Sequence, residues 1–152
     1  MESMERVREQ FDDYRLYIID HFNVNSDELS TCLIVFDYLT DRRSFTLNYV
    51  TYGTLMQVTQ YSNEQFPLLV KATDFLTTPK AYLLEMHFEF LDEFMEEPEP
   101  INPKDVHVAL TEGTFYHPHT GTTVVDFNKY IYPVFRPSTM LRTYRRVMSE
   151  GQ

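Results

Sequence analysis

The stretch LLEMHFEFLDEFMEE, from Leu83 to Glu97, decides which fold the sequence predicts. Up to Phe90 its apolar and polar side chains alternate, as they do in a half-buried strand, but the alternation stops there. At about 100° per residue, the whole stretch instead separates into an acidic side and an apolar side. A helix therefore accounts for more of its positions than a strand does.

We predict a helix over residues 79–97, with Thr78 as its N-cap and Pro98 as its stop signal. Packing of its apolar side should outweigh the unfavourable negative charge at its C-terminal end. The acidic side of this predicted helix consists of Glu85, Glu89, Asp92, Glu93 and Glu96.

Helical spacing of apolar residues predicts another helix over residues 3–22. Three segments rich in β-branched and aromatic residues follow, and they predict an antiparallel meander with strands at 31–39, 45–52 and 55–61. A helix over 62–76 would pair with the helix at 79–97 and cover one face of this sheet.

The segment 96–103 carries three prolines and predicts a stiff, extended strap. Beyond it, a short final helix capped by Ser138 is predicted. Further strands are predicted at 106–110, 114–116, 122–127 and 130–135. The expected fold is α+β, an antiparallel β-sheet with an N-terminal helix, a central helix pair on one face and a short C-terminal helix. Residues 1–152 are expected to form a single domain, because the part after the strap is marginal as an independent fold.

Composition favours a globular protein of the cytosol. The 152 residues include 12 Phe and 11 Tyr but only 4 Gly, which supplies bulky core material. No apolar run approaches the ~20 residues that span a bilayer, so we expect no membrane association. Cys32, the single cysteine, stands in an apolar run and is interpreted as a buried small hydrophobe, and the chain as cytoplasmic.

The net charge of −10 is unevenly distributed along the chain. Residues 1–128 hold 22 acidic and 8 basic side chains, whereas residues 129–152 hold 5 basic and 1 acidic. An acidic body repels phosphate backbones, so direct binding of nucleic acid is disfavoured. The basic tail, 136–152, places Tyr144 beside Arg142, Arg145 and Arg146, which makes these residues candidates for contact with a partner.

Two histidines in the turn 117–121 are the candidate metal ligands. His117 and His119 would point to the same side of an extended chain, which suits a divalent metal, although a proline-containing turn with exposed histidines is the more common interpretation. No nucleophile elbow and no glycine-rich phosphate loop is present in the sequence. We therefore expect neither catalysis nor a cofactor.

Three functions remain open from sequence. The favoured one is a non-catalytic interaction or assembly subunit, in which the basic tail docks on a partner protein or on the acidic residues of a neighbouring copy, giving a homo-oligomer. In the second, the carboxylates imitate a nucleic acid and inhibit a protein that binds DNA or RNA, as small phage inhibitors do by analogy. The third is a metal-dependent hydrolase that uses His117 and His119.

Overall fold

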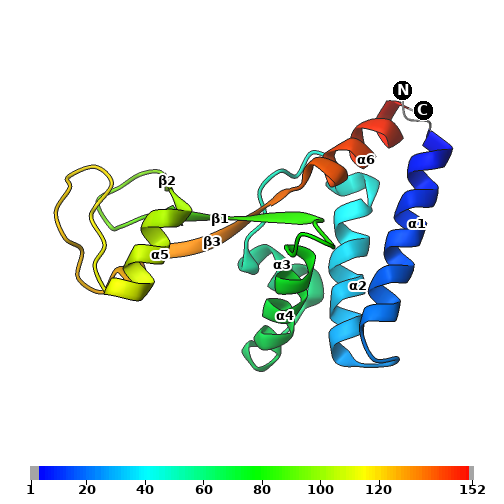
Figure 1. Ribbon diagram of the computed structural model, residues 1–152, viewed down its shortest axis with the longest axis horizontal. Coiled ribbons are helices and arrows are strands. Elements are labelled where there is room, and N and C mark those ends of the chain that lie inside the picture. Colours follow the sequence, from blue (N-terminus) through cyan, green and yellow to red (C-terminus); the bar gives the residue numbers. More distant parts are fainter. Residues whose placement is uncertain (1–3, 151–152) are drawn as a thin grey trace. The chain divides into compact units, whose positions relative to one another are not determined.

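A computed structural model describes residues 4–150, which contain six α-helices and one three-stranded sheet (Figure 1). This confirms the predicted α+β class. The helices are α1 (Met4–His21), α2 (Asp27–Thr40), α3 (Tyr52–Thr59), α4 (Phe66–Leu76), α5 (Pro103–Glu112) and α6 (Thr139–Glu150). The strands are β1 (Leu84–Phe90), β2 (Glu99–Ile101) and β3 (Ile131–Pro137).

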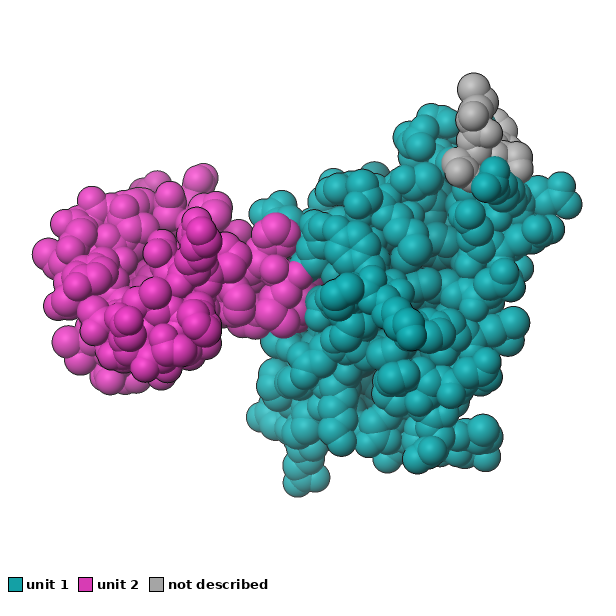
Figure 2. All heavy atoms as spheres, in the orientation of Figure 1, with its two compact units in different colours: residues 1–85, 136–152 teal, residues 86–135 magenta. Residues whose placement is uncertain are grey.

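The chain divides into two compact units, which Figure 2 distinguishes by colour. Unit 1 comprises residues 1–85 and 136–152, of which 4–85 and 136–150 are described, and unit 2 comprises Met86–Phe135. The boundaries fall inside β1 and β3, so unit 2 is an insertion between two segments of unit 1. That the whole chain acts as a single domain stays a prediction.

Unit 1 is a helical body built around α2. This helix packs against α1, α3 and α4, and α1 also packs against α6. Val35 and Leu39 of α2 are completely buried, as are Ile18 of α1 and Leu69 of α4. The apolar spacing of α1 and the Pro67 start signal of α4 correctly predicted these two helices.

The predicted meander over residues 31–61 is wrong. Residues 31–39 lie in α2, which Ser26 caps by accepting a hydrogen bond from the backbone N–H of Leu29 at 3.1 Å. Residues 55–59 lie in α3, which a capping box of Thr51 and Thr54 begins. The middle of α2, Cys32–Phe36, is an uninterrupted apolar run, and a short apolar run cannot be told from a buried strand by its period alone.

The predicted helix over residues 79–97 is also wrong, because this segment contains β1. β1 is the middle strand of the order β2-β1-β3, and it pairs antiparallel with β2 in the register Phe88–Ile101. The alternation that stops after Phe90 marks the end of the strand. Of the predicted helix pair, therefore, only α4 exists.

Unit 2 has its own small core, formed by the buried residues Phe90, Ile101, Val106, Ala109 and Phe115. Two of these lie in α5, where residues 106–110 were predicted to be a strand; Asn102 caps this helix and Pro103 begins it. The predicted strap at 96–103 contains β2 and leads directly into α5. Residues 116 and 123 form an isolated antiparallel bridge, in agreement with the expected turn between them.

The last two predicted elements are confirmed. The segment 130–135 lies largely in β3, and Ser138 precedes α6, where its hydroxyl oxygen accepts a hydrogen bond from Leu141 N at 3.1 Å. Within residues 4–150, no helix combines the length and the apolar character that crossing a membrane requires.

Candidate functional site

The five predicted acidic residues do not form one side of a helix, because they belong to a strand and to the loop that follows it. Glu85 and Glu89 lie on β1, where Glu89 is buried and Glu85 is hydrogen-bonded to the hydroxyl of Tyr82. Asp92, Glu93 and Glu96 lie in the irregular connection that follows β1. The helical row of carboxylates that would have served the nucleic-acid-mimic hypothesis is therefore not formed by this segment.

The basic tail belongs to the helical body of unit 1. The ring of Tyr144 stacks on that of Phe11 with centroids 4.1 Å apart. Arg145 is only 4% exposed. Arg142 and Arg146 are exposed on the same helix.

Arg145 connects α6 to the end of α2 through hydrogen bonds. Its Nε and Nη2 donate hydrogen bonds to the carbonyl oxygen of Leu39 at 3.2 and 2.9 Å, and its Nη1 donates to that of Leu47 at 2.7 Å. The last carbonyl groups of a helix lack partners within the helix and carry partial negative charge, so a guanidinium is well suited to them. Burial lowers the pKa of Arg145 from its ordinary value.

The histidine turn of unit 2 is held by His117. Its Nδ1 accepts hydrogen bonds from the backbone N–H groups of His119 and Thr120 at 3.1 and 3.3 Å. Since an accepting nitrogen carries no proton, the proton of a neutral ring lies on Nε2, which donates to Asp92 Oδ2 at 2.8 Å. Gly121 closes the turn with φ +73° and a 2.9 Å hydrogen bond from its N–H to the carbonyl oxygen of His117.

Asp92 connects this turn to the loop that follows β1. While one carboxylate oxygen accepts from His117, the other accepts from the backbone N–H of Phe94 at 3.0 Å. Burial alone would raise the pKa of Asp92, but the hydrogen bonds from His117 and from Phe94 N–H lower it below its ordinary value. One carboxylate thus positions both the loop and the turn.

A second pair joins His119 Nε2 to Glu99 Oε2 at 3.2 Å on the surface. Among residues 4–150, no group of three or more His, Cys, Asp or Glu side chains is arranged to hold a metal ion. Both nitrogens of His117 are hydrogen-bonded, so neither is free to act as a ligand or as a general base. The predicted roles of His117 and His119 in metal binding find no support in this geometry.

A cavity of about 590 Å³ lies between the loop and the turn that Asp92 connects. Apolar side chains border it: Phe94 is 88% exposed and Val125 81% exposed, while Met95 and Tyr130 also line the wall. Sequence reasoning missed Phe94 and Val125. The signal in the sequence was Phe94, an aromatic residue within a run of acidic ones. The predicted helix had placed Phe94 on its buried apolar side.

Exposed large apolar side chains are concentrated in unit 2. It holds five of the eight that occur among the described residues, with only about a third of the chain. Unit 2 also has nine acidic and two basic side chains, a net charge of −7 with histidines neutral. The five apolar side chains are Phe94, Val108, Leu110, Tyr116 and Val125.

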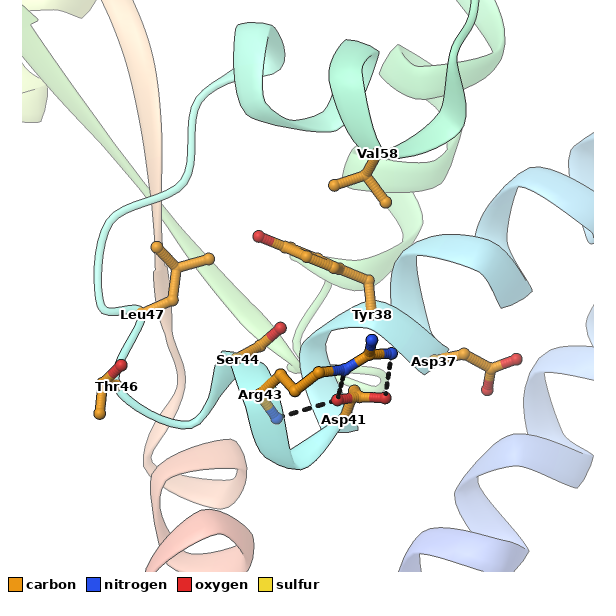
Figure 3. Close-up of a pocket in the computed structure, with 8 residues that line it drawn as sticks. All are labelled: Asp37, Tyr38, Asp41, Arg43, Ser44, Thr46, Leu47 and Val58. Atoms are coloured by element: carbon orange, nitrogen blue, oxygen red, sulfur yellow. Dashed lines mark hydrogen bonds and ion pairs between the residues drawn. The ribbon is translucent and has the colours of Figure 1, made fainter.

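Unit 1 contains a larger cavity, of about 710 Å³, and Figure 3 shows the pair of Arg43 and Asp41 in its lining. The guanidinium of Arg43 donates two hydrogen bonds to the carboxylate of Asp41 at 3.0 and 3.1 Å. The pKa of Asp41 is lowered to about 2 by these bonds and by the backbone N–H of Arg43. Asp37, also in the lining, pairs with Arg15 of α1 at 3.1 Å.

Cys32 is confirmed as a buried residue of α2. Burial raises the pKa of its thiol to about 12, so the reactive thiolate is scarcely populated at neutral pH.

No protein-family model matches the chain, and comparison with curated proteins and with solved structures found no significant match.

Proposed function

We propose that this chain is a non-catalytic protein-binding subunit and that unit 2 carries its binding surface. The supporting observation is the exposed pair Phe94 and Val125 at the border of the 590 Å³ cavity. Contiguous apolar side chains exposed beside a cavity are typical of surfaces that bind other proteins.

The geometry of the cavity supports a preformed surface. Asp92 fixes Phe94 through its backbone N–H and fixes the opposite turn through His117. Binding to a preorganised surface avoids much of the entropy that ordering a loop would cost. The bond holds the backbone of Phe94, and its exposed ring is of the aromatic type that is enriched in protein interfaces.

The charge of unit 2 indicates the chemistry of the partner. Glu93, Glu96 and Glu97 are exposed near Phe94 in the sequence, and the whole unit has a net charge of −7. The partner we propose is therefore a basic segment of another protein that also presents aliphatic or aromatic side chains. Two copies of the same acidic surface would repel each other, so symmetric self-association through unit 2 is disfavoured.

A random-peptide display library tests this proposal without knowledge of the natural partner. Purified protein should enrich peptides that combine Lys or Arg with aliphatic or aromatic residues, and their affinity should fall as salt rises. The double variant Phe94→Ser with Val125→Ser should lose binding. The matched control is Val24→Ser, because Val24 is 78% exposed but lies in unit 1.

Two results would contradict the proposal. Equal enrichment by the double variant and the control would show that the apolar border is not the binding surface. Sedimentation over a range of concentration and salt provides the second test, because the proposed foreign partner predicts a monomer. A dimer that dissociates in the double variant would instead make a second copy the partner.

A further inference from the structure

A small pocket in unit 1 is lined by three arginines and, among the described residues, by no carboxylate. It has a volume of about 250 Å³ and lies between α6 and the segment before α3. Its lining residues are Phe45, Asn48, Arg142, Arg145, Arg146 and Ser149. Such a concentration of positive charge is unexpected in a chain with a net charge of −10.

The three arginines differ in what their guanidinium groups contact. Arg145 is fixed by its hydrogen bonds to the carbonyl oxygens of Leu39 and Leu47, which leave two of its five N–H groups available. Arg142 and Arg146 are exposed, and their side chains have no hydrogen-bond or ion-pair partner among residues 4–150. Arg43 and Arg15, by contrast, are each paired with an aspartate.

The arrangement costs free energy in the absence of an anion. Arg142 and Arg146 are four residues apart on α6, where like charges repel each other, and Arg145 lies between them in the sequence. Glu150 is four residues beyond Arg146 on the same helix, yet no ion pair joins them. An anion in the pocket would relieve this repulsion.

The donors of the pocket indicate the kind of anion. Guanidinium groups pair well with phosphate oxygens because several N–H groups can bind several oxygens at once. The amide of Asn48 and the hydroxyl of Ser149 add neutral donors. A phosphoryl group, with about two negative charges and three acceptor oxygens, matches three cations better than a carboxylate does.

From this geometry we infer that the pocket formed by Arg142, Arg145, Arg146, Asn48 and Ser149 is a binding site for a phosphate-type oxyanion. The oxyanion is either free or carried as a phosphoryl group on a larger ligand. This site lies in unit 1 and is independent of the protein-binding surface proposed for unit 2.

Titration of the protein with inorganic phosphate, followed by NMR of backbone amides and arginine Nε–H groups, tests the inference. We expect saturable shifts confined to residues 45–48 and 142–149, and no such shifts with sodium chloride at the same ionic strength. The variant Arg142→Gln with Arg146→Gln should weaken binding by about tenfold or more for each arginine, as expected for the loss of a charge-assisted hydrogen bond.

The control variant Arg15→Gln with Arg43→Gln removes the same amount of charge but leaves the pocket unchanged. Loss of phosphate binding in the first variant, with binding retained in the control, supports the site. Equal weakening in both variants, or equal shifts with chloride, would show only non-specific charge screening and would overturn the inference.

A peptide containing phosphoserine separates the two sources of the oxyanion. Tighter binding of this peptide than of inorganic phosphate, and loss of that advantage in the Arg142 and Arg146 variant, would identify a phosphorylated chain as the ligand. Equal affinities would identify a free phosphate-type anion. Both results support the pocket, whereas failure of the peptide and of inorganic phosphate to bind overturns it.

Discussion

Replacing Arg145 with methionine should destabilise unit 1, because it leaves two carbonyl oxygens without their donors. Arg145 is 4% exposed and donates three hydrogen bonds to the carbonyl oxygens of Leu39 and Leu47. A buried acceptor without a donor costs about 1–3 kcal/mol, so the two together cost about 2–6 kcal/mol.

Two effects place the expected loss near the lower end of that range. Arg145 lines a pocket, so water that enters the space left by the shorter methionine side chain would partly replace the lost donors. Removing the guanidinium also relieves the cost of burying a positive charge, the same cost that lowers its pKa. We therefore expect the free energy of unfolding to fall by about 2–3 kcal/mol for Arg145→Met.

Urea unfolding, followed by far-ultraviolet circular dichroism, measures this loss as a lower midpoint at an unchanged slope. Arg146→Met is the matched control, because Arg146 is the next residue on α6 but is exposed, and it should change the free energy of unfolding by less than about 0.5 kcal/mol. A loss for Arg145→Met as small as that of the control would refute the structural role of the guanidinium.

Three further predictions test other parts of the structure. The hydroxyl of Tyr14 is buried without a hydrogen-bond partner among the described residues. Tyr14→Phe should therefore raise the free energy of unfolding by about 1 kcal/mol in the same urea assay. A free energy of unfolding below that of the unsubstituted protein would show that the hydroxyl is hydrogen-bonded in solution. Phe90 is completely buried in the core of unit 2, whereas Phe94 is exposed. Phe90→Ala should therefore lower the free energy of unfolding by about 3–5 kcal/mol, and Phe94→Ala by less than about 0.5 kcal/mol. Similar losses for the two variants would contradict this difference in burial. The folded state lowers the pKa of Asp92, so the ionised carboxylate stabilises the fold fully above the ordinary aspartate pKa of 3.8, and this stabilisation is lost as the pH falls through the lowered pKa. The amides of residues 114–124 should therefore lose protection from hydrogen exchange in acid. Asp92→Asn should remove that pH dependence.

The sequence predicted the elements whose signals are local. α1 has a regular apolar spacing, α4 begins with Pro67, and α6 follows the cap Ser138. Each of these signals is contained within the segment itself, so no knowledge of tertiary structure is needed to recognise it. The α+β class was also predictable, although most of the predicted strands were wrong.

The missed elements depend on packing that the sequence does not display. α2 packs against three other helices, and its apolar run Cys32–Phe36 covers more than one side of the helix, so this run alone resembles a buried strand. In β1 the alternation was visible, but the acidic loop after Phe90 was read together with it. Ending the segment at Phe90 would have given the strand.

The candidate site was predictable only in part. Arg142 and Arg146 are exposed as expected, but the burial of Arg145 results from its contact with Leu39, which is 106 residues away in the chain. The pairing of His117 with Asp92 spans 25 residues and likewise depends on tertiary structure. A single sequence gives no direct sign of such pairs.

The insertion of unit 2 between β1 and β3 has a consequence for biosynthesis. Domains tend to fold as the chain emerges from the ribosome, starting from the N-terminal side. Here the first 85 residues cannot complete their unit until residues 136–150 emerge, because α6 packs on α1 and Arg145 binds the end of α2. The inserted unit is formed by 50 consecutive residues and can fold during this delay, so unit 2 should be complete before unit 1 is.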